Sequence, residues 1–597
     1  MANEEQQTNV EKYEFEPIKG YPMLNWKGKR PFRSTQYFPA QLKEVYGHED
    51  DNGWINKIFW GDNLQVMSHL LKDYRGKVNL IYIDPPFDSK VDYKREIKLK
   101  GEKIKSDSTS FEEKQYGDVW SNDEYLQFMY ERLIIAKELL SETGSIYLHC
   151  DWHKSHHLRC VMDEIFGNGG EKGKSGGFKN EISWCYSDAA NSKTQWNTKH
   201  DIILFYTKSA TWTFNYKSVL REMSESSIKK YKYTDEDGNK YRLFGKNIQG
   251  SPIQWHRDVP PEWENSHPEL VYRHYMKEGS LPLDWWTINP VNQAAKERTG
   301  YPTQKPQELL ERIIKASSNE GDLVFDFFMG SGTLQSVANN LGRKFIGADI
   351  NLGAIQTTTK RLYSQKASFE VYNVNNYDVF RNPVEAKDLL IEALEIQKLD
   401  SNVVYDGEKD GYKVKIMPVN RIATKEDLNE LVANFPYKKF EERKAANPNK
   451  PVEEIMLVCM GHEPGLGATL ENECGYKLKV EVVDILRDKS DLTFKYDSEA
   501  VIKVQEGKLI VDAFYPRNLL QKLSQQKDDV AEWREMVESI MIDWNYDGAV
   551  MEPVVIDIPD KNEFVAGEYE IPQGASNIKI KITDLLSESY EEVIAHG

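Results

Sequence analysis

The chain has 597 residues, 40% of them hydrophobic, which is enough for about three to four domain-sized units. It contains no apolar run of about 18 residues that could span a membrane, and its polar, acidic N-terminus does not resemble a signal peptide. Its five cysteines include no C-x-x-C pair, which is typical of a reduced, cytosolic protein without structural zinc. These features exclude a membrane protein and a disulfide-stapled secreted protein.

The net charge of −18 is distributed unevenly along the chain. Residues 366–597 hold 28 Lys and Arg against 45 Asp and Glu, whereas residues 1–365 hold 49 against 50. A uniformly acidic protein would repel the phosphates of nucleic acid. Because the acidity is concentrated in the C-terminal part, the first 365 residues can carry local basic faces.

An aromatic-rich extension, residues 1–55, precedes a regular alternation of strands and helices. Hydrophobic periodicity predicts helices at residues 63–74, 124–140 and 151–166, and strands at residues 57–60, 78–83, 144–149, 180–187 and 201–207. The polar stretch at residues 88–117 has no clear period, and we expect a long loop there.

Residues 209–290 interrupt this alternation with many Tyr, Trp, Lys, Asn and Pro residues and little periodicity. The alternation then resumes, with helices predicted at residues 307–316 and 333–341 and strands at residues 323–327 and 344–349. Beyond residue 365, a short helical stretch at residues 384–397 leads into β-rich segments at residues 412–418, 477–485, 501–513, 554–558 and 578–582.

This pattern predicts an α/β fold with a mostly parallel sheet and helices on both faces, an inserted region and a β-rich C-terminal domain. The units expected are an N-terminal extension, two halves of one α/β domain, the insertion between those halves, and an acidic α+β C-terminal domain. Their boundaries are residues 1–55, 56–208, 209–290, 291–365 and 366–597.

The first chemical motif is Asp84-Pro85-Pro86-Phe87, directly after the predicted strand at residues 78–83. Ligands of open α/β sheets bind outside the carboxyl ends of the strands, so the motif is well placed for a site. An aromatic amine is a poor nucleophile because its lone pair is delocalised into the ring. The Asp84 carboxylate and the Pro85 carbonyl could accept the N–H bonds of such an amine and direct its lone pair.

The rest of this motif fits the same task. The two prolines have no N–H and stiffen the loop, and Phe87 offers a flat apolar face to a base swung out of a duplex. The alternative is a plain strand-terminating turn, because Asp-Pro is common in turns.

The second motif runs from Asp326 to Thr333 and joins a predicted strand to a helix. Gly330 and Gly332 permit a tight turn and a close approach to a ligand, and the start of the helix offers free N–H groups. No Lys follows the glycines, so this is not a phosphate loop. An acid at the end of the next strand, Asp349, is placed to bind ribose hydroxyls. The combination suits an adenosyl ligand without phosphates; the alternative is an ordinary strand–helix turn.

Together these motifs resemble the D-P-P-[YF] and F-x-G-x-G motifs of the amino-methylating DNA methyltransferases. The catalytic motif precedes the cofactor motif, as in the β class of that family. The arrangement is most similar to the adenine-N6 modification subunits of type III restriction–modification systems, over about residues 20–365. Further matching segments lie at residues 61–63, 144–151, 180–182, 199–201 and 301–306.

The resemblance implies a Rossmann-like methyltransferase fold and S-adenosylmethionine as cofactor. It implies that Asp84, Pro85, Pro86 and Phe87 bind and activate the target base. It also implies that the cofactor is bound by Asp62 near its adenine, Thr303 and Lys305 near its carboxylate, Asp326 near its ammonium, Asp349 near its ribose, and Phe328, Gly330, Gly332 and Thr333 along its length. Many members have Tyr in place of Phe87; the ring face is kept, so we expect activity to be kept.

Residues 209–290 lie where family members carry a target-recognition region. Basic and aromatic side chains alternate there and suit phosphate contacts and base stacking. The candidates for DNA contact are Lys229, Lys230, Lys232, Tyr233, Arg242, Lys246 and Arg257. The alternative is a solvated charged face, because Asp235, Glu236 and Asp237 lie nearby.

A second cluster, between His149 and His157, has the residue types of a metal site. Spacing in a helix could place His153 and His157 on one face, but methyl transfer to an amine needs no metal and the family has similar residues there. No metal site is expected.

These observations predict a site-specific adenine-N6 DNA methyltransferase that flips its target base. Methylation of cytosine N4 is the nearest alternative, although that branch usually has Ser at the position of Asp84. An RNA or protein amine, or a catalytically silent DNA-targeting subunit, are further alternatives. We expect double-stranded DNA as substrate, a homodimer formed through the C-terminal domain, a restriction (helicase–nuclease) or other defence subunit as a possible partner, and a place in the prokaryotic cytosol near the nucleoid.

Overall fold

The computed structural model describes most of the chain. The described segments are residues 12–14, 23–86, 92–98, 110–117, 122–170, 175–186, 192–246, 258–292, 295–301, 303–374, 394–399, 404–418, 423–463, 465–485, 498–526, 532–559 and 563–596, with a few single residues between them.

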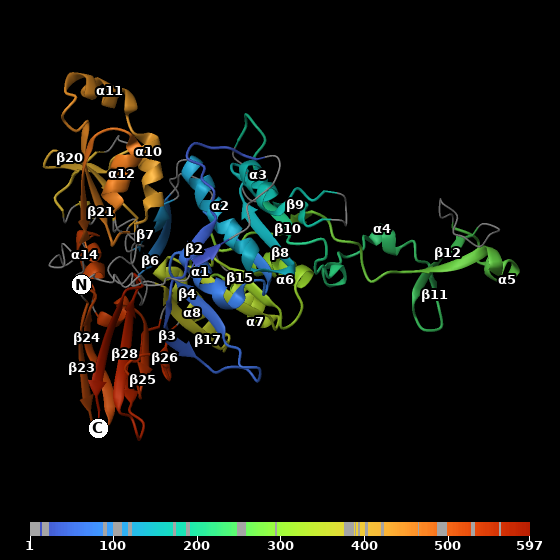
Figure 1. Cartoon of the computed structure of the whole chain (residues 1–597). Helices are drawn as coiled ribbons and strands as arrows, with labels where there is room; N and C mark the ends of the chain where they lie inside the picture. Colours follow the sequence, from blue (N-terminus) through green and yellow to red (C-terminus); the bar gives the residue numbers. More distant parts are fainter. Residues whose placement is uncertain are drawn as a thin grey trace, which may run out of the picture.

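A ten-stranded sheet forms the centre of the molecule (Figure 1). Its order is β14 (Trp285–Thr287), β9 (Gly177–Cys185), β10 (His200–Thr207), β8 (Leu140–Cys150), β5 (Val78–Ile83), β15 (Leu323–Asp326), β16 (Lys344–Asp349), β4 (Asn56–Trp60), β17 (Phe369–Val374) and β3 (Ala40–Tyr46). The strands from β8 to β17 are all parallel, whereas β10 and β3 run antiparallel to their neighbours. The predicted mostly parallel sheet is confirmed.

Helices cover both faces of this sheet. One hydrophobic cluster unites the sheet with α1 (Asn63–Tyr74), α2 (Asn122–Leu139) and α3 (Ser155–Phe166); the other unites it with α6 (Gln307–Ser317), α7 (Thr333–Asn340) and α8 (Leu352–Ser364). Alternate residues of β5 supply the two clusters, with Ile81 and Ile83 on one face and Leu80 and Tyr82 on the other. Within the described residues, no helix is both long and apolar enough to span a membrane.

Two segments differ from their predictions. The N-terminal extension contributes β3, which pairs with β17 and completes one edge of the sheet. The long loop predicted at residues 88–117 was wrong in part, because β6 (Asp92–Lys98) and β7 (Ser110–Gly117) form an antiparallel pair there. Its strands have no alternating hydrophobic pattern, which is the signal on which a strand prediction depends. The helix predicted at residues 384–397 lies mostly outside the described residues.

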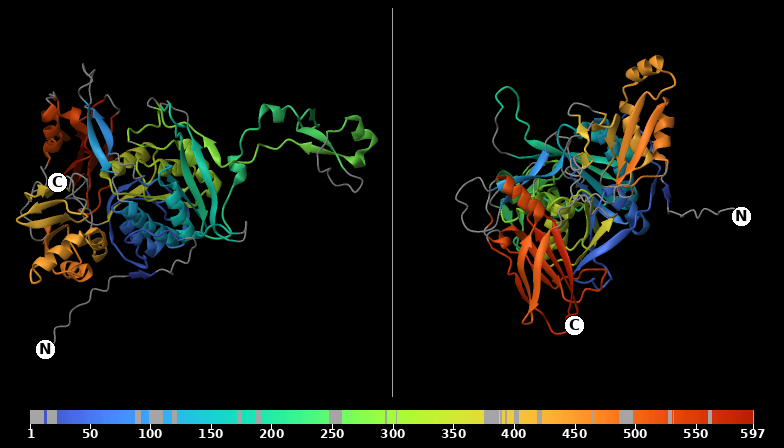
Figure 2. Two further views of the ribbon diagram at one scale, coloured as in Figure 1. Left: turned by 90° about the horizontal axis from the view of Figure 1, so that it is seen from above. Right: turned by 90° about the vertical axis from the view of Figure 1, so that its left-hand side faces the viewer.

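Most of the insertion at residues 209–290 forms an arm that projects away from the sheet (Figures 1 and 2), whereas β14, near its end, belongs to the central sheet. The arm contains η1 (Tyr216–Val219), α4 (Glu225–Ile228), α5 (Glu262–Ser266), η2 (Pro268–Leu270) and a three-stranded antiparallel sheet of β11 (Tyr233–Thr234), β12 (Lys240–Gly245) and β13 (Val271–Tyr275). A small core of Tyr241, Leu243 and Val271 stabilises this sheet.

The C-terminal part forms two lobes at the end of the molecule opposite the arm (Figures 1 and 2). The first has a five-stranded sheet, β18 (Gln397–Lys398), β19 (Gly407–Lys409), β20 (Tyr412–Ile416), β21 (Glu453–Cys459) and β22 (Leu478–Asp484), with η3 (Lys425–Asp427), α10 (Leu428–Asn434), α11 (Tyr437–Ala446) and α12 (Leu466–Cys474).

The second lobe consists of two antiparallel sheets that share one hydrophobic core. One sheet contains β23 (Glu499–Gln505), β24 (Lys508–Tyr515) and β27 (Glu568–Glu570), and the other contains β26 (Val555–Asp557), β25 (Val537–Asp543), β28 (Asn577–Asp584) and β29 (Ser589–Ala595). The lobe also carries α14 (Arg517–Gln526) and η4 (Trp533–Met536). The β-rich C-terminal domain that the sequence predicts is therefore present.

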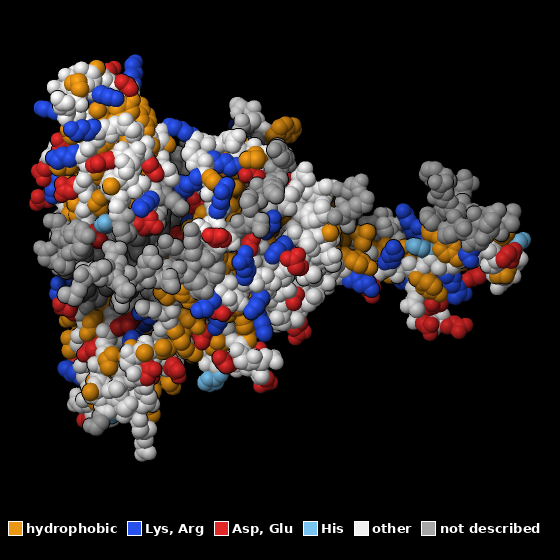
Figure 3. Space-filling view, viewed as in Figure 1, with side chains coloured by type: hydrophobic (Ala, Val, Ile, Leu, Met, Phe, Trp, Pro, Cys, Tyr) orange, Lys and Arg blue, Asp and Glu red, His pale blue; other side chains and the backbone are white. Residues whose placement is uncertain are grey.

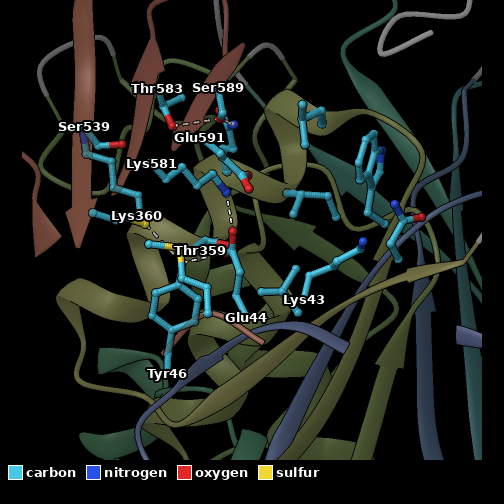
Figure 4. Close-up of a pocket in the computed structure, with 18 of the residues that line it drawn as sticks. Lys43, Glu44, Tyr46, Thr359, Lys360, Ser539, Lys581, Thr583, Ser589 and Glu591 are labelled. Carbon is cyan, nitrogen blue, oxygen red and sulfur yellow. Dashed lines mark hydrogen bonds and ion pairs between the residues drawn. The ribbon is translucent and has the colours of Figure 1, made fainter. Parts of the chain in front are cut away.

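The second lobe is joined to the edge of the central sheet. The backbone of Met551 pairs with that of β3, and Met541 and Met551 belong to the same hydrophobic cluster as Tyr46. A cavity of about 210 Å³ lies at this junction, where Lys581 forms an ion pair with Glu44 (Figure 4). The C-terminal part is thus packed on the central sheet through both apolar and charged contacts.

A buried ion pair joins α1 and α2 next to the sheet. Arg132 donates to the carboxylate of Asp62 over 3.0 Å and also to Asn63, and the Asn63 amide donates to the carbonyl of Phe327 over 3.0 Å. Asp62 additionally caps α1 by accepting from two of its backbone N–H groups. This network fixes the start of α1 against the loop that follows β15.

We predict that Arg132→Met lowers the free energy of unfolding by about 3 kcal/mol, because it leaves the buried carboxylate of Asp62 without its cation. Urea unfolding measures the change. The matched control is Arg75→Met, whose partner Glu138 lies in an exposed pair, and which we expect to cost less than about 1 kcal/mol. An equal decrease in the free energy of unfolding in the two variants would contradict the larger contribution that we predict for the buried pair.

Candidate functional site

The two chemical motifs meet at one edge of the sheet. Strands β5 and β15 are parallel neighbours, with Leu80 opposite Val324 and Ile81 opposite Phe325. The residues that follow both strands therefore emerge at the same edge, although about 240 positions separate them in the sequence. The predicted site required that the ends of these two strands lie together, and their pairing brings them together.

Asp84 is held at this edge by a lysine from the segment before α6. Lys305 forms an ion pair with Oδ2 of Asp84 and also lies 3.4 Å from the carbonyl oxygen of Thr303. Both side chains are mostly buried, with 18% of Asp84 and 11% of Lys305 exposed. The structure thus brings Lys305 to the first motif. The predicted place of Thr303 and Lys305 near the carboxylate of the cofactor stays a prediction.

The other oxygen of Asp84 faces the interior. Oδ1 is buried and has no hydrogen-bond partner among the described residues, and Nδ1 of His149 lies 3.9 Å away. The same ring nitrogen of His149 lies 2.8 Å from the hydroxyl oxygen of Tyr82, within hydrogen-bond distance. On the far side of the ring, Nε2 lies 3.1 Å from the carboxylate of Asp201. A completely buried imidazole therefore lies between two carboxylates.

The glycine loop after β15 has the tight turn that its sequence predicts. Gly330 and Gly332 both have positive φ, 52° and 67°. A Cβ atom at Gly332 would lie 2.5 Å from the side chain of Thr358, so a larger residue would clash as well as strain the backbone. The N–H of Gly330 donates to Asp349 over 2.8 Å, which ties the loop to the end of β16.

Buried carboxylates surround this loop. Burial raises the pKa of Asp349 to about 6, although the N–H groups of Asn351 and Gly330 lower it. Burial, together with the charges of Asp84 and Asp349, raises the pKa of Asp326 well above its ordinary value. Uncompensated negative charge in this region would be stabilised by a positively charged ligand. The residues present therefore fit S-adenosylmethionine, which carries a sulfonium and an ammonium group.

The remaining predicted cofactor residues differ in their environment. The Phe328 ring is partly exposed and lies 6.1 Å from that of Phe128. The Thr333 hydroxyl accepts from Arg361, and both oxygens of Asp62 are already used within the network of Arg132 and α1. These hydrogen bonds support a structural function for Thr333 and Asp62; their predicted cofactor contacts stay predictions. Phe87 lies outside the described residues.

The basic candidates of the arm are also distributed unequally. Lys230 and Lys232 are exposed, and Lys229 is exposed beside Glu225, 3.7 Å away. Arg242 forms an ion pair with Asp258 and lies over the ring of Phe244, so it contributes to the packing of the arm.

Three further candidates complete the predicted DNA-contacting set. Tyr233 and Lys246 are half-buried, the latter over the Tyr272 ring, and Arg257 lies outside the described residues. The β11–β12 turn carries acidic side chains at the edge of the arm (Figure 3). The arm therefore presents both signs of charge, and the exposed lysines around Tyr231 are its best candidates for phosphate contact.

Sequence reasoning missed the group of Tyr82, His149 and Asp201. It matched residues 144–151 and 199–201 to the family and considered His149 as a metal ligand, but it gave none of the three residues a role in the reaction. Within the described residues, no group of three or more His, Cys, Asp or Glu side chains is arranged to hold a metal ion. The available signal was positional: all three residues lie on the adjacent strands β5, β8 and β10, near the edge that carries Asp84.

Comparisons with known proteins agree with this geometry. Residues 78–360 match a family model described as DNA methylase. The chain is 32% identical to the type II methyltransferase M1.MboII of Moraxella bovis over 298 residues, which cover 50% of this chain and 92% of that protein. It is 26% identical to the DNA adenine methyltransferase YhdJ of Escherichia coli, over 51% of this chain and 82% of that protein.

Two further likenesses cover similar shares of the chain. The StyLTI Mod subunit, a type III restriction–modification enzyme of Salmonella typhimurium, is 26% identical over 47% of this chain, and the match spans only 49% of that subunit. Among solved structures, the M1.HpyAVI–SAM complex aligns with 51% of this chain and 98% of its own, at 18% identity and a TM-score of 0.30. The family assignment rests on the sequence matches. By these matches and by the order of its two motifs, the chain belongs to the N6/N4 DNA methylase family, in its β class.

Proposed function

We propose that this protein is a site-specific DNA methyltransferase that transfers a methyl group from S-adenosylmethionine to N6 of adenine. The observation that carries the proposal is the convergence of Asp84 with the Gly330–Gly332 loop and Asp349 at the ends of neighbouring strands. Base flipping is required, because N6 within a stacked duplex is out of reach of a site at the edge of a sheet. Sequencing DNA that the protein has modified tests the proposal and identifies the target site.

The residues of the chain have mainly to align the reactants. The cofactor supplies a methyl group that is already activated by its sulfonium sulfur. Asp84 and the Pro85 carbonyl accept the N–H bonds of the amine and direct its lone pair at the methyl carbon, and the surrounding side chains exclude water. N6 becomes acidic only as the methyl group arrives, so Asp84 can take the proton late.

Lys305 has to yield its position to the substrate. It occupies Oδ2, the outer oxygen of Asp84, which is the acceptor that an incoming amine needs. The substrate therefore replaces one ion-pair partner of Asp84, and the displaced ammonium remains free to bind an anionic group such as the carboxylate of the cofactor. This exchange shields the outer oxygen of Asp84 until a base is in place.

Adenine is favoured over cytosine by Asp84 itself, because the branch of the family that methylates N4 usually has Ser there. An RNA or protein amine fits less well with a large projecting arm. A catalytically silent targeting subunit is disfavoured because Asp84, Gly330 and Gly332 are all present. A methyl-transfer assay on genomic DNA, with a cofactor-binding assay beside it, distinguishes these possibilities.

The arm and the C-terminal lobes suggest how the protein is organised on DNA. We propose that the arm, at residues 209–290, contacts double-stranded DNA and selects the site. The acidic C-terminal lobes are poor surfaces for phosphate, and we propose that they mediate homodimerisation or docking of a restriction or other defence subunit. Because the proposed substrate is chromosomal, the expected location is the prokaryotic cytosol beside the nucleoid.

Asp84→Ala is the first test of this site. We expect methylation of DNA to fall by at least 10³-fold while the affinity for S-adenosylmethionine changes little, because the amine loses its acceptor and the cofactor loses none. Radiolabelled methyl transfer and calorimetric binding measure the two quantities. Asp73→Ala, an exposed change on α1, is the matched control. Normal turnover in Asp84→Ala would refute the assignment.

Acid pH is expected to weaken cofactor binding. The pKa of Asp349 is raised to about 6, so its carboxylate, the acceptor for ribose hydroxyls, is lost as the pH falls through that value. If only the ionised form binds, the apparent Kd is about tenfold higher at pH 5 than at pH 7. Calorimetry at both values checks this, with Asp349→Asn expected to bind weakly and to show less change. An equal Kd at pH 5 and 7 would argue against Asp349 as the ribose acceptor.

DNA binding is expected to depend on the exposed lysines of the arm. Replacing both Lys230 and Lys232 by Ala removes two phosphate contacts, so affinity falls and the slope of log Kd against log salt decreases by about 2. Fluorescence anisotropy over a salt series measures this. The matched control replaces Lys438 and Lys439, two exposed lysines of α11 in the acidic part. Identical slopes for both double variants would exclude this part of the arm from DNA contact.

A further inference from the structure

The inner side of Asp84 has a feature that the proposed reaction does not explain. Its Oδ1 is buried, faces the interior and accepts no hydrogen bond among the described residues. A buried carboxylate oxygen without a partner is costly, and such an atom in a functional site indicates a partner that arrives during the reaction. The group that faces it is the imidazole of His149, with Nδ1 at 3.9 Å.

Side chains from several strands contact the imidazole ring of His149. Asp201 on β10 lies 3.1 Å from Nε2, Tyr82 on β5 lies 2.8 Å from Nδ1, and the Trp184 ring on β9 packs edge-on at 5.4 Å. Because burial and nearby carboxylates raise the pKa of Tyr82, it stays protonated and donates to Nδ1. The ring proton of neutral His149 is then on Nε2, where it donates to Asp201.

Two carboxylates lie beside the His149 ring. Burial alone would raise the pKa of Asp201, yet the hydrogen bond and charge of His149, with the charge of Lys305, hold it below its ordinary value. An imidazolium would therefore lie between two carboxylates, those of Asp84 and Asp201. The charged and titratable groups that face this region are Tyr82, Asp84, Tyr186, Asp201, Lys305 and, from β15, Asp326.

We propose that His149 is a positioning residue that acts through Asp84 and takes over the proton released by the methylated amine. The inference rests on the proposed methyl transfer. As the bond from N6 to the methyl carbon forms, the bond from that carbon to sulfur breaks, and sulfur keeps the electron pair. The N6 proton moves to Asp84. It arrives on Oδ2, so the carboxyl group of Asp84 then rotates and brings this O–H within hydrogen-bond reach of Nδ1 of His149. The O–H bond breaks, an N–H bond forms at Nδ1, and the Tyr82 hydroxyl turns so that its oxygen accepts.

This transfer has a clear driving force. An imidazole in water is roughly 10²–10³-fold more basic than a carboxylate, so the proton is stored more stably on the ring. While the flipped base covers the outer oxygen, the buried inner oxygen leads to His149. The transfer restores the ionised Asp84, which prevents the methylated amine from regaining its proton, and solvent takes the proton from His149 after the product leaves.

The experiment measures single-turnover methyl transfer from radiolabelled S-adenosylmethionine to adenine-unmethylated genomic DNA between pH 5.5 and 8.5. Saturating S-adenosylmethionine is used at every pH, so that weaker cofactor binding through Asp349 does not limit the rate. His149→Gln is expected to slow transfer at pH 7.5 by at least tenfold at saturating DNA and cofactor, with cofactor affinity within twofold. Asp201→Asn, which keeps the ring and removes its anionic partner, is expected to show a smaller loss.

His153→Gln is the matched control, because it makes the same change at an exposed histidine of the neighbouring segment and is expected to stay within twofold. Thermal melting verifies that each variant is folded; if His149→Gln is not, Asp201→Asn decides. A rate for the folded variant within twofold of the unaltered protein at every pH would overturn the inference and leave the proposed function intact. No transfer by the unaltered protein would overturn both.

Discussion

The parallel pairing of β5 with β15 is the constraint on which the site depends. Each strand ends in a loop that is chemically incomplete, since one carries the acceptor for an amine and the other the turn that admits an adenosyl ligand. Two hydrogen-bonded neighbours in a sheet lie about 4.8 Å apart, so their loops are necessarily within reach of each other. The hydrophobic clusters on both faces of the sheet maintain this distance, and the contact from Asn63 to Phe327 reinforces it.

Electrostatics gives the same edge its selectivity for positive charge. Asp84, Asp326 and Asp349 converge there, and Lys305 is the cation that the structure places on the first of them. Raised pKa values at Asp326 and Asp349 show that this arrangement disfavours the ionised carboxylates. A ligand that brings a sulfonium and an ammonium group would reduce the electrostatic repulsion between these carboxylates. In the proposed reaction, the substrate amine then competes with Lys305 for Asp84. Before the reactants bind, Lys305 thus pairs with Asp84, while Asp326 and Asp349 disfavour further negative charge at this edge.

The arm and the C-terminal lobes lie at opposite ends of the catalytic sheet, and each is connected differently. The arm is inserted between β10 and α6 and has a small core of its own, so its surface can vary without disturbing the site. The second C-terminal lobe, in contrast, shares a hydrophobic cluster with β3 and β17 at the edge of the sheet. A partner that displaces this lobe would act on the sheet directly, whereas one that binds the arm would act on DNA selection.

The sequence by itself determined the order and type of the main elements and the family to which the chain belongs. Helix α1 has the predicted bounds, because its apolar positions recur with helical period and Asp62 caps its start. Asp84 and residues 326–333 could be predicted as site residues because each motif is local, with its side chains and turns specified within eight positions. The resemblance to a known family depended on the same local patterns.

Only the tertiary structure determined which residues distant in the sequence lie next to one another. The ion pair of Lys305 with Asp84, the imidazole of His149 behind that carboxylate, and the addition of β3 to the sheet all join residues that are far apart in the chain. The β6–β7 pair escaped prediction because polar strands have no hydrophobic alternation to reveal them. Burial and long-range contact depend on how the strands are ordered in the sheet, and a linear pattern of residue types does not contain that order.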